Sequence, residues 1–583
     1  MTKLSARFGM KAAGQPELNV LKITVLVVMA CLYVVSCQSK GGTMADLVLF
    51  NGQVWTIDPD LPEVSALAIS HNRILATGRN SEIKKLIGPE TKVIDLKGAF
   101  ILPGFIDAHT HFLTGGFALQ SVKLRDCRSR EEFIGRIAAK AAELPTGSWI
   151  LNGDWDHEQF EPPELPRKEW IDPVSPNNPV CVNRYDGHMV LVNSLALKLA
   201  RIGKETISPP GGEIVKDPVS GEPTGILKDA ACQLVYAIIP EPSMEEKLAA
   251  VRAALNEAAS HGVTSIHDMS DLDTYEVYDV LRQRGELTAR LYVYDQISDI
   301  DNFLKMREKI GAGHPFLRLA GLKGFVDGSL GSSTAYFFEP YVDQPGTHGL
   351  LASHMYPEGI MEKRLIEADR AGCQVAVHAI GDRANALILD LYQEVFEQDK
   401  PRDRRWRVEH AQHLRKEDIA RFGQLGVIAS VQPYHAIDDG CWAEKKIGAE
   451  RIKTTYAFNS LLKSGARLVF GSDWTVAPLN PLSGIYAAVT RRTLDGEHPE
   501  GWIPEEKISV EEAIKGYTIN AAYAEFTEKE KGSIKPGKLA DLVVIDKNIL
   551  KIKPEEIMSA SVLMTIVDGR IIFDRLGKEG QSQ

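Results

Sequence analysis

Cysteine is scarce in this 583-residue sequence: seven are present, with no CxxC pair and no dense cluster, which excludes a cysteine zinc site and a disulfide scaffold. An excess of positive charge is also lacking, since 67 Lys and Arg face 78 Asp and Glu and the formal net charge is −11. We therefore expect no nucleic-acid partner. What is present, 44% hydrophobic and 25% charged residues, is typical of a folded globular chain, and the length favours one large domain with a smaller one.

The amino terminus has the pattern of an export signal. Basic residues precede an uncharged, mostly apolar run over residues 23–35, as a charged n-region precedes an apolar h-region, and the run is short for a membrane span. It ends in Val-Val-Ser-Cys at residues 34–37, which resembles a bacterial lipoprotein box. We expect residues 1–36 to be a lipoprotein signal peptide and Cys37 to carry the lipid.

This pattern predicts an exported, membrane-anchored protein. Residues 37–44 would form a polar tether, and two acyl chains suffice for stable attachment to a membrane surface. The folded part would then face the periplasm or the cell exterior. The alternative is a cytoplasmic protein whose translation starts at Met44, just before the first predicted strand.

Two distant segments contain short strand-like runs separated by Asn-Gly, Gly and Asp-Gly turns, namely ADLVLFNGQVWTID near the start and GSIKPGKLADLVVID near the end. Such runs are typical of small antiparallel sheets. We predict one β-sandwich-like accessory domain built from both ends of the chain, residues 45–102 and 531–583.

Between these segments, apolar strand-like runs alternate with amphipathic helical stretches, the pattern of repeated βα units around a parallel sheet. Polar and titratable residues repeatedly follow the strands, at the rim where barrel enzymes place their chemistry. We predict an α/β fold, a (β/α)8 TIM barrel over residues 103–480, followed by a helical connection over residues 481–530.

Five side chains at predicted strand ends have the chemistry of a metal site. His109 and His111 are two residues apart, so an extended chain points both to the same side. His378, His410 and Asp473 end three later strands. Imidazole nitrogens and a carboxylate suit a borderline ion such as zinc and leave room for a water molecule.

The ordered motifs GFIDAHTH, VHAIGD, VEHAQ and GSDW, with the closing GSIKPGKLADLVVID, resemble the amidohydrolase superfamily, in particular amidohydrolase family 3, the YtcJ-like and N-substituted formamide deformylase group. The resemblance runs from about Ala45 to the end. It implies one or two divalent ions, with zinc the expected metal, held by His109, His111, His378, His410 and Asp473.

The resemblance also concerns the segment GLKGFVDGSLGSSTA. It places Lys323 where many amidohydrolases carry a carboxylated lysine that bridges two ions. The alternative is an unmodified ammonium group that neutralises nearby carboxylates such as Asp327. The number of ions stays open between these readings.

A further resemblance, in NRYDGHMVLVNS, places His188 near the second barrel strand, where it would contact the substrate or a developing oxyanion. The remaining candidates have two readings each: His267, near the third strand, as a rim residue or a packed one; Asp382, orienting His378 or capping a helix; Trp155, His157 and Tyr185, lining the substrate pocket or filling the core; and His413 and His435, in the pocket or at the surface.

The resulting hypothesis is a metal-dependent hydrolase of a C–N bond in a small amide-like molecule, with Asp473 as the proton carrier and metal-activated water as the nucleophile. The family suggests N-substituted formamide or N-acyl substrates, and its members often form homo-oligomers. One alternative is a deaminase or a lactone or ester hydrolase on the same scaffold. Another is a non-catalytic exported lipoprotein that binds a metal or a small ligand.

Overall fold

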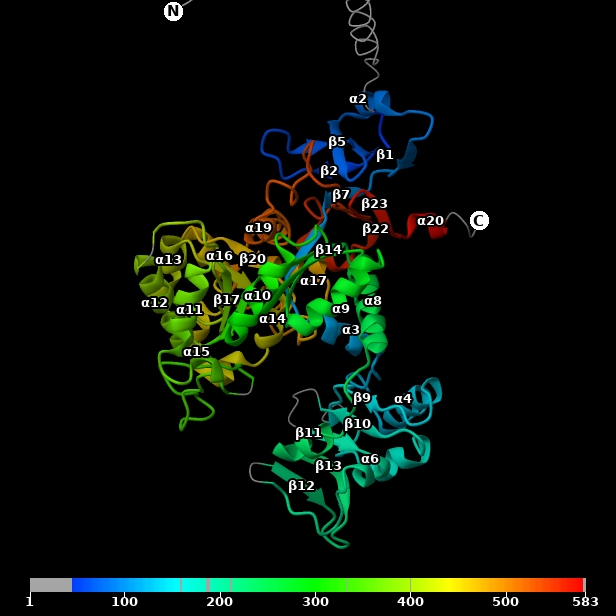
Figure 1. The fold of residues 1–583 in the computed structure, drawn as a ribbon, viewed down its shortest axis with the longest axis vertical. Coiled ribbons are helices and arrows are strands. Elements are labelled where there is room, and N and C mark those ends of the chain that lie inside the picture. The colour runs from blue at the N-terminus through cyan, green and yellow to red at the C-terminus, as the bar shows by residue number, and fades with distance from the viewer. Residues whose placement is uncertain are drawn as a thin grey trace, which may run out of the picture.

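The computed structural model describes residues 44–157, 160–184, 189–209, 212–331, 333–398 and 400–579. Eight parallel strands form its central sheet (Figure 1). In spatial order they are β8 (Phe105–Thr110), β14 (Val263–Met269), β15 (Arg290–Gln296), β16 (Leu317–Phe325), β17 (Gln374–Ala379), β18 (Arg407–His410), β19 (Ile428–Val431) and β20 (Leu468–Phe470). The predicted (β/α)8 barrel is confirmed.

The connecting helices cover the outside of this barrel (Figure 1). They include α8 (Met244–Ser260), α9 (Leu272–Gln283), α10 (Ile300–Ile310), α11 (Ile360–Arg370), α12 (Asp382–Gln398), α13 (Lys416–Leu425), α16 (Phe458–Lys463), α17 (Pro481–Thr490), α18 (Val510–Gly516) and α19 (Ile519–Ala524). The start of α8 illustrates why they form where they do. The Ser243 side chain accepts from the Glu246 N–H, and the Glu246 carboxylate accepts from the Ser243 N–H, which is a capping box.

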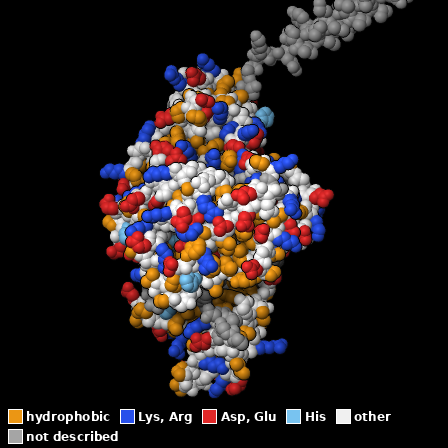
Figure 2. Space-filling view, turned by 90° about the vertical axis from the view of Figure 1, so that its left-hand side faces the viewer, with side chains coloured by type: hydrophobic (Ala, Val, Ile, Leu, Met, Phe, Trp, Pro, Cys, Tyr) orange, Lys and Arg blue, Asp and Glu red, His pale blue; other side chains and the backbone are white. Residues whose placement is uncertain are grey.

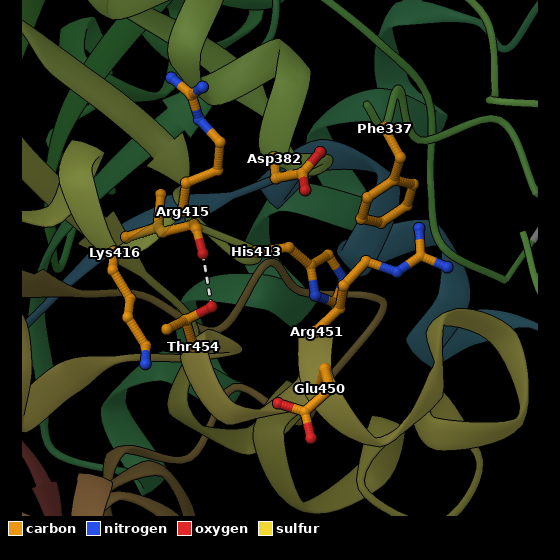
Figure 3. Close-up of a pocket in the computed structure, with 9 residues that line it drawn as sticks. Phe337, Asp382, His413, Arg415, Lys416, Glu450, Arg451 and Thr454 are labelled. Atoms are coloured by element: carbon orange, nitrogen blue, oxygen red, sulfur yellow. Dashed lines mark hydrogen bonds between the residues drawn. The ribbon is translucent and has the colours of Figure 1, made fainter. Parts of the chain in front are cut away.

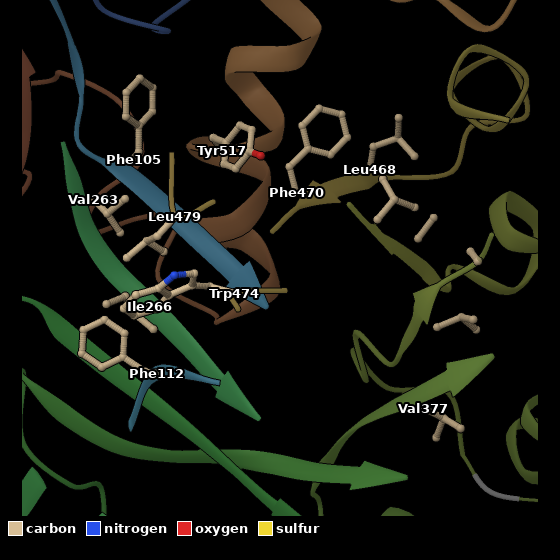
Figure 4. Packing of buried hydrophobic residues seen from close by; sticks show 14 of the residues in the cluster. Phe105, Phe112, Val263, Ile266, Val377, Leu468, Phe470, Trp474, Leu479 and Tyr517 are labelled. Carbon is tan, nitrogen blue, oxygen red and sulfur yellow. The ribbon is translucent and has the colours of Figure 1, made fainter. Parts of the chain in front are cut away.

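The barrel closes between β20 and β8. Just beyond β20, the Asp473 N–H donates to the His109 carbonyl at 2.7 Å, and the His111 N–H donates to the Trp474 carbonyl at 2.7 Å. On the side of the seam towards the accessory domain, the ring of Tyr517 packs edge-on against those of Phe105 and Phe470, with centroid distances of 6.4 and 5.5 Å (Figure 4). Closure therefore brings the last predicted ligand against the first pair.

Both ends of the chain build the accessory domain. One sheet has the order β5 (Arg73–Gly78), β4 (Ala66–Ser70), β1 (Leu47–Phe50), β6 (Lys92–Asp95); the other has the order β23 (Arg570–Asp574), β22 (Val562–Val567), β21 (Leu542–Ile545), β7 (Phe100–Pro103), β2 (Gln53–Trp55), β3 (Glu63–Val64). Apolar residues of both sheets, such as Leu67 and Val544, share one buried cluster. The predicted sandwich from the two termini is therefore confirmed.

A separate lobe interrupts the barrel after α3 (Phe112–Gln120). It holds α4 (Arg130–Glu143), α5 (Lys168–Ile171), α6 (Ser194–Leu199), α7 (Gln233–Tyr236) and a sheet of order β12 (Gly212–Lys216), β13 (Pro223–Asp229), β11 (Met189–Val192), β10 (Val180–Asn183), β9 (Ile150–Leu151). The chain returns to the barrel at α8, so a narrow neck joins the lobe to the rest (Figure 1). The predicted barrel range 103–480 thus also contains this lobe, which the sequence did not reveal.

The predicted signal peptide and Cys37 lie outside the described residues, as does all of the predicted tether except Met44. Within the described ranges, no helix is both long and apolar enough to cross a bilayer. Positive and negative side chains are interspersed over the barrel on the face shown in Figure 2.

Candidate metal centre

The five predicted ligands come from the carboxyl ends of four barrel strands. His109 lies in β8 and His111 directly follows it; His378 lies in β17, His410 ends β18, and Asp473 follows β20. One ligand atom each from His109, His410 and Asp473 lies within 4.8 Å of the other two. The rings of His378 and His410 are 4.5 Å apart between centroids. The structure therefore brings these residues, distant in sequence, to one place.

Acceptor atoms fix which nitrogen of each imidazole carries the proton. His109 Nδ1 lies 2.5 Å from a Glu409 carboxylate oxygen, and His111 Nδ1 lies 3.0 Å from the Met269 carbonyl. Carbonyl and carboxylate oxygens only accept, so each Nδ1 must donate. In the neutral ring, the Nε2 of both histidines then keeps a lone pair.

The other two histidines follow the same logic. His410 Nδ1 lies 2.7 Å from the Gln432 Oε1, and His378 Nε2 lies 3.0 Å from the Gly328 carbonyl. Each ring thus donates through one nitrogen and keeps a lone pair on the other. Histidines that ligate metals are oriented by such partners, which also fix the tautomer.

The carboxylate of Asp473 faces the Nε2 atoms of His109 and His111. Its Oδ1 lies 3.5 Å from His109 Nε2 and 3.3 Å from His111 Nε2, and it is a buried oxygen without a hydrogen-bond partner among the described residues. Two ligands of one tetrahedral zinc ion lie about 3.3–3.4 Å apart, given zinc–ligand distances of about 2.0–2.1 Å. The donor set therefore fits a divalent cation.

Charge in this pocket points the same way. Burial, helped by the positive charge of Lys323, lowers the pKa of His109 to about 4 and that of His378 to about 3, so both rings are neutral, as metal ligands must be. Burial opposes ionisation of His111, but the Asp473 carboxylate raises its pKa. A protonated His111 and a bound metal ion would therefore compete for the negative charge of Asp473.

The backbone is unusual at two of these positions. His410 has φ +73° and Asp473 has φ +57°, the left-handed region that residues other than glycine seldom adopt. Such conformations cost about 1–3 kcal/mol each and cluster at functional sites. Close packing adds to the constraint, since a Cβ on Gly471 would lie 2.5 Å from the backbone nitrogen of His109.

Lys323 lies in β16, the fourth barrel strand, and is buried with its Nζ 3.4 Å from His109 Nε2. Burial lowers its pKa to about 8. Asp327 itself accepts from the backbone N–H groups of Tyr336, Ile380 and Gly381 at 2.7–3.0 Å. The carboxylates whose charges act on Lys323 are those of Glu409 and Asp473, so the bridging and the neutralising readings of Lys323 both remain predictions.

His188 lies outside the described residues. Its placement near the second barrel strand stays a prediction; the strands that precede and follow it in sequence, β10 and β11, belong to the inserted lobe. The second strand is β14, which holds His267. His267 therefore lies within the second strand, beside Tyr292 of the third, and does not follow the third strand; it is fully buried.

Two further candidates, Trp155 and Asp382, form hydrogen bonds away from the predicted ligands. Trp155 is fully buried in the core of the lobe and donates to the Val182 carbonyl, so it does not line a pocket; Tyr185 lies outside the described residues. Asp382 begins α12 and accepts from the Phe338 N–H at 2.9 Å, whereas His378 bonds elsewhere.

A cavity of about 200 Å³ lies beside the predicted ligands' loops without including any ligand (Figure 3). Asp382, His413, Arg415 and Arg451 line it. His413 is nevertheless buried, with Nδ1 2.8 Å from the Thr455 hydroxyl. Of its two readings, the structure therefore favours the pocket over the surface.

Sequence reasoning missed two residues that surround the ligands. Glu409 and Gln432 hold the rings of His109 and His410. His435 was a candidate, and its ring lies parallel to that of His410 with a centroid distance of 6.5 Å, which favours its pocket reading. Glu409, the partner of His109, directly precedes the predicted ligand His410 in VEHAQ. This adjacency was the signal by which the sequence could have indicated Glu409.

A closed (β/α)8 barrel with neutral imidazoles and a carboxylate converging at the carboxyl ends of its strands defines a TIM-barrel metal-dependent hydrolase. Comparison with known proteins is consistent with this class. The chain belongs to the amidohydrolase family, whose family model matches residues 92–573.

Individual relatives agree with this assignment. The chain is 41% identical to the protein LONG AFTER FAR-RED 3 of Arabidopsis thaliana, over 92% of this chain and 93% of the relative. It is 29% identical to N-substituted formamide deformylase of Arthrobacter pascens, over 92% of this chain and 99% of the relative. A solved structure, an uncharacterized metal-dependent hydrolase from Pyrococcus horikoshii, is similar with a TM-score of 0.73 at 28% identity, covering 87% of this chain and 99% of that chain.

Proposed function

We propose that this protein hydrolyses a C–N bond in a small amide-like molecule, with a divalent metal ion held by His109, His111, His378, His410 and Asp473. The observation that carries the proposal is the convergence of imidazole lone pairs on the unpartnered Oδ1 of Asp473. Zinc is the metal that this donor set suits best. When bound, such an ion supplies a Lewis acid and a water molecule of lowered pKa.

Asp473 is the group that would move the proton. Its Oδ1 is buried, points into the ligand cluster and is left without a donor by the rest of the described chain. It would take a proton from the attacking water and deliver it to the departing nitrogen, because expulsion of an amine needs protonation. A lactone or ester would not need this second transfer.

An N-substituted formamide or an N-acyl amine is the substrate class we propose. The support is the similarity to N-substituted formamide deformylase at 29% identity, together with a carboxylate able to protonate a leaving amine. Fold and ligands alone do not fix specificity.

The test uses purified protein loaded with zinc and a panel of formamides, N-acyl amines, aminated heterocycles and lactones. We expect an amine and a carboxylate as products from the amide panel. Release of ammonia would replace this proposal with a deaminase, and turnover of lactones alone would replace it with an ester hydrolase. Bound metal without turnover of any class would favour a ligand-binding protein.

We propose carboxylation of Lys323 as the bridge for a second ion. The amine nitrogen would bond to the carbon of CO2 and lose a proton, and the resulting anion would become a ligand. The position of Nζ, 3.4 Å from His109 Nε2, supports this. Growth with ¹³C-labelled bicarbonate should give a carbamate carbon signal and two metal ions per chain, and one ion without that signal would reject the bridge.

We also propose that the chain is exported and lipidated on Cys37, on the sequence of residues 23–37. Labelled fatty acid should be incorporated by the wild-type protein and not by Cys37→Ala. Unlabelled protein starting at Met44 would support the cytoplasmic alternative.

A further inference from the structure

A line of buried charged and polar side chains crosses the barrel interior, from the predicted ligand His109 to the segment after α19. Its members are His109, Glu409, Arg407, His267, Glu525 and Lys531. Each has an exposed fraction of its side chain of 2% or less. Charges this deeply buried are costly unless each is paired, so the arrangement of the pairs matters.

The half of this line near the ligand is held by short contacts. His109 Nδ1 lies 2.5 Å from one Glu409 oxygen, and Arg407 Nε lies 2.6 Å from the other. The guanidinium also donates to the Ala108 carbonyl at 2.6 Å and to the Ser430 hydroxyl at 2.9 Å. One oxygen of Glu409 therefore accepts from Arg407, which is itself held by two further bonds, and the other oxygen accepts from the predicted metal ligand His109.

In the half of the line far from the ligand, His267 connects Arg407 to Glu525, and Lys531 balances the charge of Glu525. Arg407 Nη1 lies 2.9 Å from His267 Nδ1, and His267 Nε2 lies 2.9 Å from Glu525. Because guanidinium only donates, His267 must accept at Nδ1 and donate from Nε2. Lys531 then neutralises Glu525 at 2.7 Å. Two carboxylates and two cations alternate, and every proton along the line has a defined place.

This order has a consequence for the metal site. Glu409 can only accept, so it keeps the proton of His109 on Nδ1 and leaves the Nε2 lone pair directed at Asp473, 3.5 Å away. A rotated or differently protonated His109 would present a donor to a cation. Groups that bond the second nitrogen of a metal-ligating imidazole raise its basicity and typically contribute 10–100-fold to metal affinity.

We propose that Glu409 is a positioning residue for His109, held ionised and in place by Arg407, and that it sets the affinity of the centre for its metal. The inference rests on the proposed metal site. Glu525 belongs to the same buried line but touches no ligand, so its contribution is to the stability of the fold.

The test compares Glu409→Gln with Glu525→Gln, which remove one buried carboxylate each from the same line. Circular dichroism and thermal unfolding of the metal-free proteins report folding. Competition with a chromophoric chelator reports zinc affinity. We expect Glu409→Gln to bind zinc about 10–100-fold more weakly than wild type, and Glu525→Gln to keep wild-type zinc affinity while losing stability.

Folded Glu409→Gln protein with wild-type zinc affinity would overturn the inference, as would equal losses of affinity in both variants. If Glu409→Gln does not fold, Glu409→Asp, which keeps the charge on a shorter side chain, takes its place. We expect weakened zinc binding there too, and unchanged binding would again refute the positioning role. Failure of the wild-type protein to bind any metal would instead contradict the proposed function.

Discussion

We expect Asp473→Asn to separate turnover from folding. The residue has φ +57°, a left-handed conformation in which Asn is tolerated as Asp is, because both short polar side chains bond locally. The backbone N–H donates to the His109 carbonyl at 2.7 Å, and this closing bond of the barrel does not involve the side chain. The substitution therefore changes charge at the site with little change in the backbone.

The magnitudes follow from what Oδ1 faces. In the metal-free protein this oxygen lies 3.3–3.5 Å from the Nε2 atoms of His109 and His111. While His111 is neutral, an amide N–H in place of Oδ1 would donate to one of these nitrogens; once His111 is protonated, the variant lacks the carboxylate that raises the pKa of this ring. Above the pKa of His111, the metal-free variant should thus melt close to the wild-type temperature. Zinc affinity should fall by at least the ~10–100-fold that an outer ligand partner contributes, and turnover should fall by about 10²–10⁴-fold, the contribution of a general base.

The assay measures zinc affinity, melting temperature of the metal-free protein, and amide hydrolysis at saturating zinc. Saturation matters because it separates loss of metal from loss of the proton carrier. Wild-type turnover by the zinc-saturated variant would refute Asp473 as the proton carrier. A metal-free variant that melts far below wild type would show that the carboxylate is structural.

Three further outcomes are expected. Removing metal with a chelator should abolish hydrolysis and lower the melting temperature while far-ultraviolet circular dichroism keeps the barrel signal, and added zinc should restore both; full activity after verified removal would contradict a metal-dependent reaction. In Gly116→Ala the new Cβ would lie 2.1 Å from the Ala250 carbonyl oxygen. We expect urea denaturation to show a loss of about 1–3 kcal/mol or more in the free energy of unfolding. The control is Gly135→Ala on α4, where the new Cβ would have no atom within 4 Å; it should be neutral or stabilising. Burial lowers the pKa of His413 from 6.5 to about 3. Since the unfolded chain alone binds this proton between those values, His413 should contribute a loss of up to about 1.4 kcal/mol in the free energy of unfolding per pH unit as the pH drops below 6.5. A pH series in which His413→Gln keeps the wild-type slope would show that this residue makes no such contribution.

The sequence predicted the barrel and the gathering of five side chains because each ends a strand, and the carboxyl ends of barrel strands share one rim. It did not predict the inserted lobe. Most strand pairs of the lobe are antiparallel, and this part of the chain lies inside the range predicted for the barrel. His188 was placed near the second barrel strand by the resemblance of NRYDGHMVLVNS alone. Local periodicity identifies elements and does not say to which sheet they belong.

The buried line of charges was invisible for another reason. Glu409 lies 300 residues from His109 and Arg407 lies 140 residues from His267, so no spacing rule connects them. Read alone, the arginine and the glutamate of RVEH are ordinary polar residues of a strand. Only the closure of the sheet turns them inward to face each other.

The insertion point of the lobe bears on how the site keeps its geometry. The chain enters the lobe from α3, which begins directly after the predicted ligand His111. A displacement of the lobe would therefore act on the helix that follows this ligand. Gly115 and Gly116 oppose this: a Cβ on the first would lie 2.3 Å from the Trp474 ring, and one on the second would lie 2.1 Å from the α8 backbone. Such close packing leaves α3 no room to slide, and Trp474 is itself bonded to the His111 N–H at 2.7 Å. The ligand geometry is therefore set by the barrel, and sequence changes within the lobe should leave the affinity of the site for metal nearly unchanged.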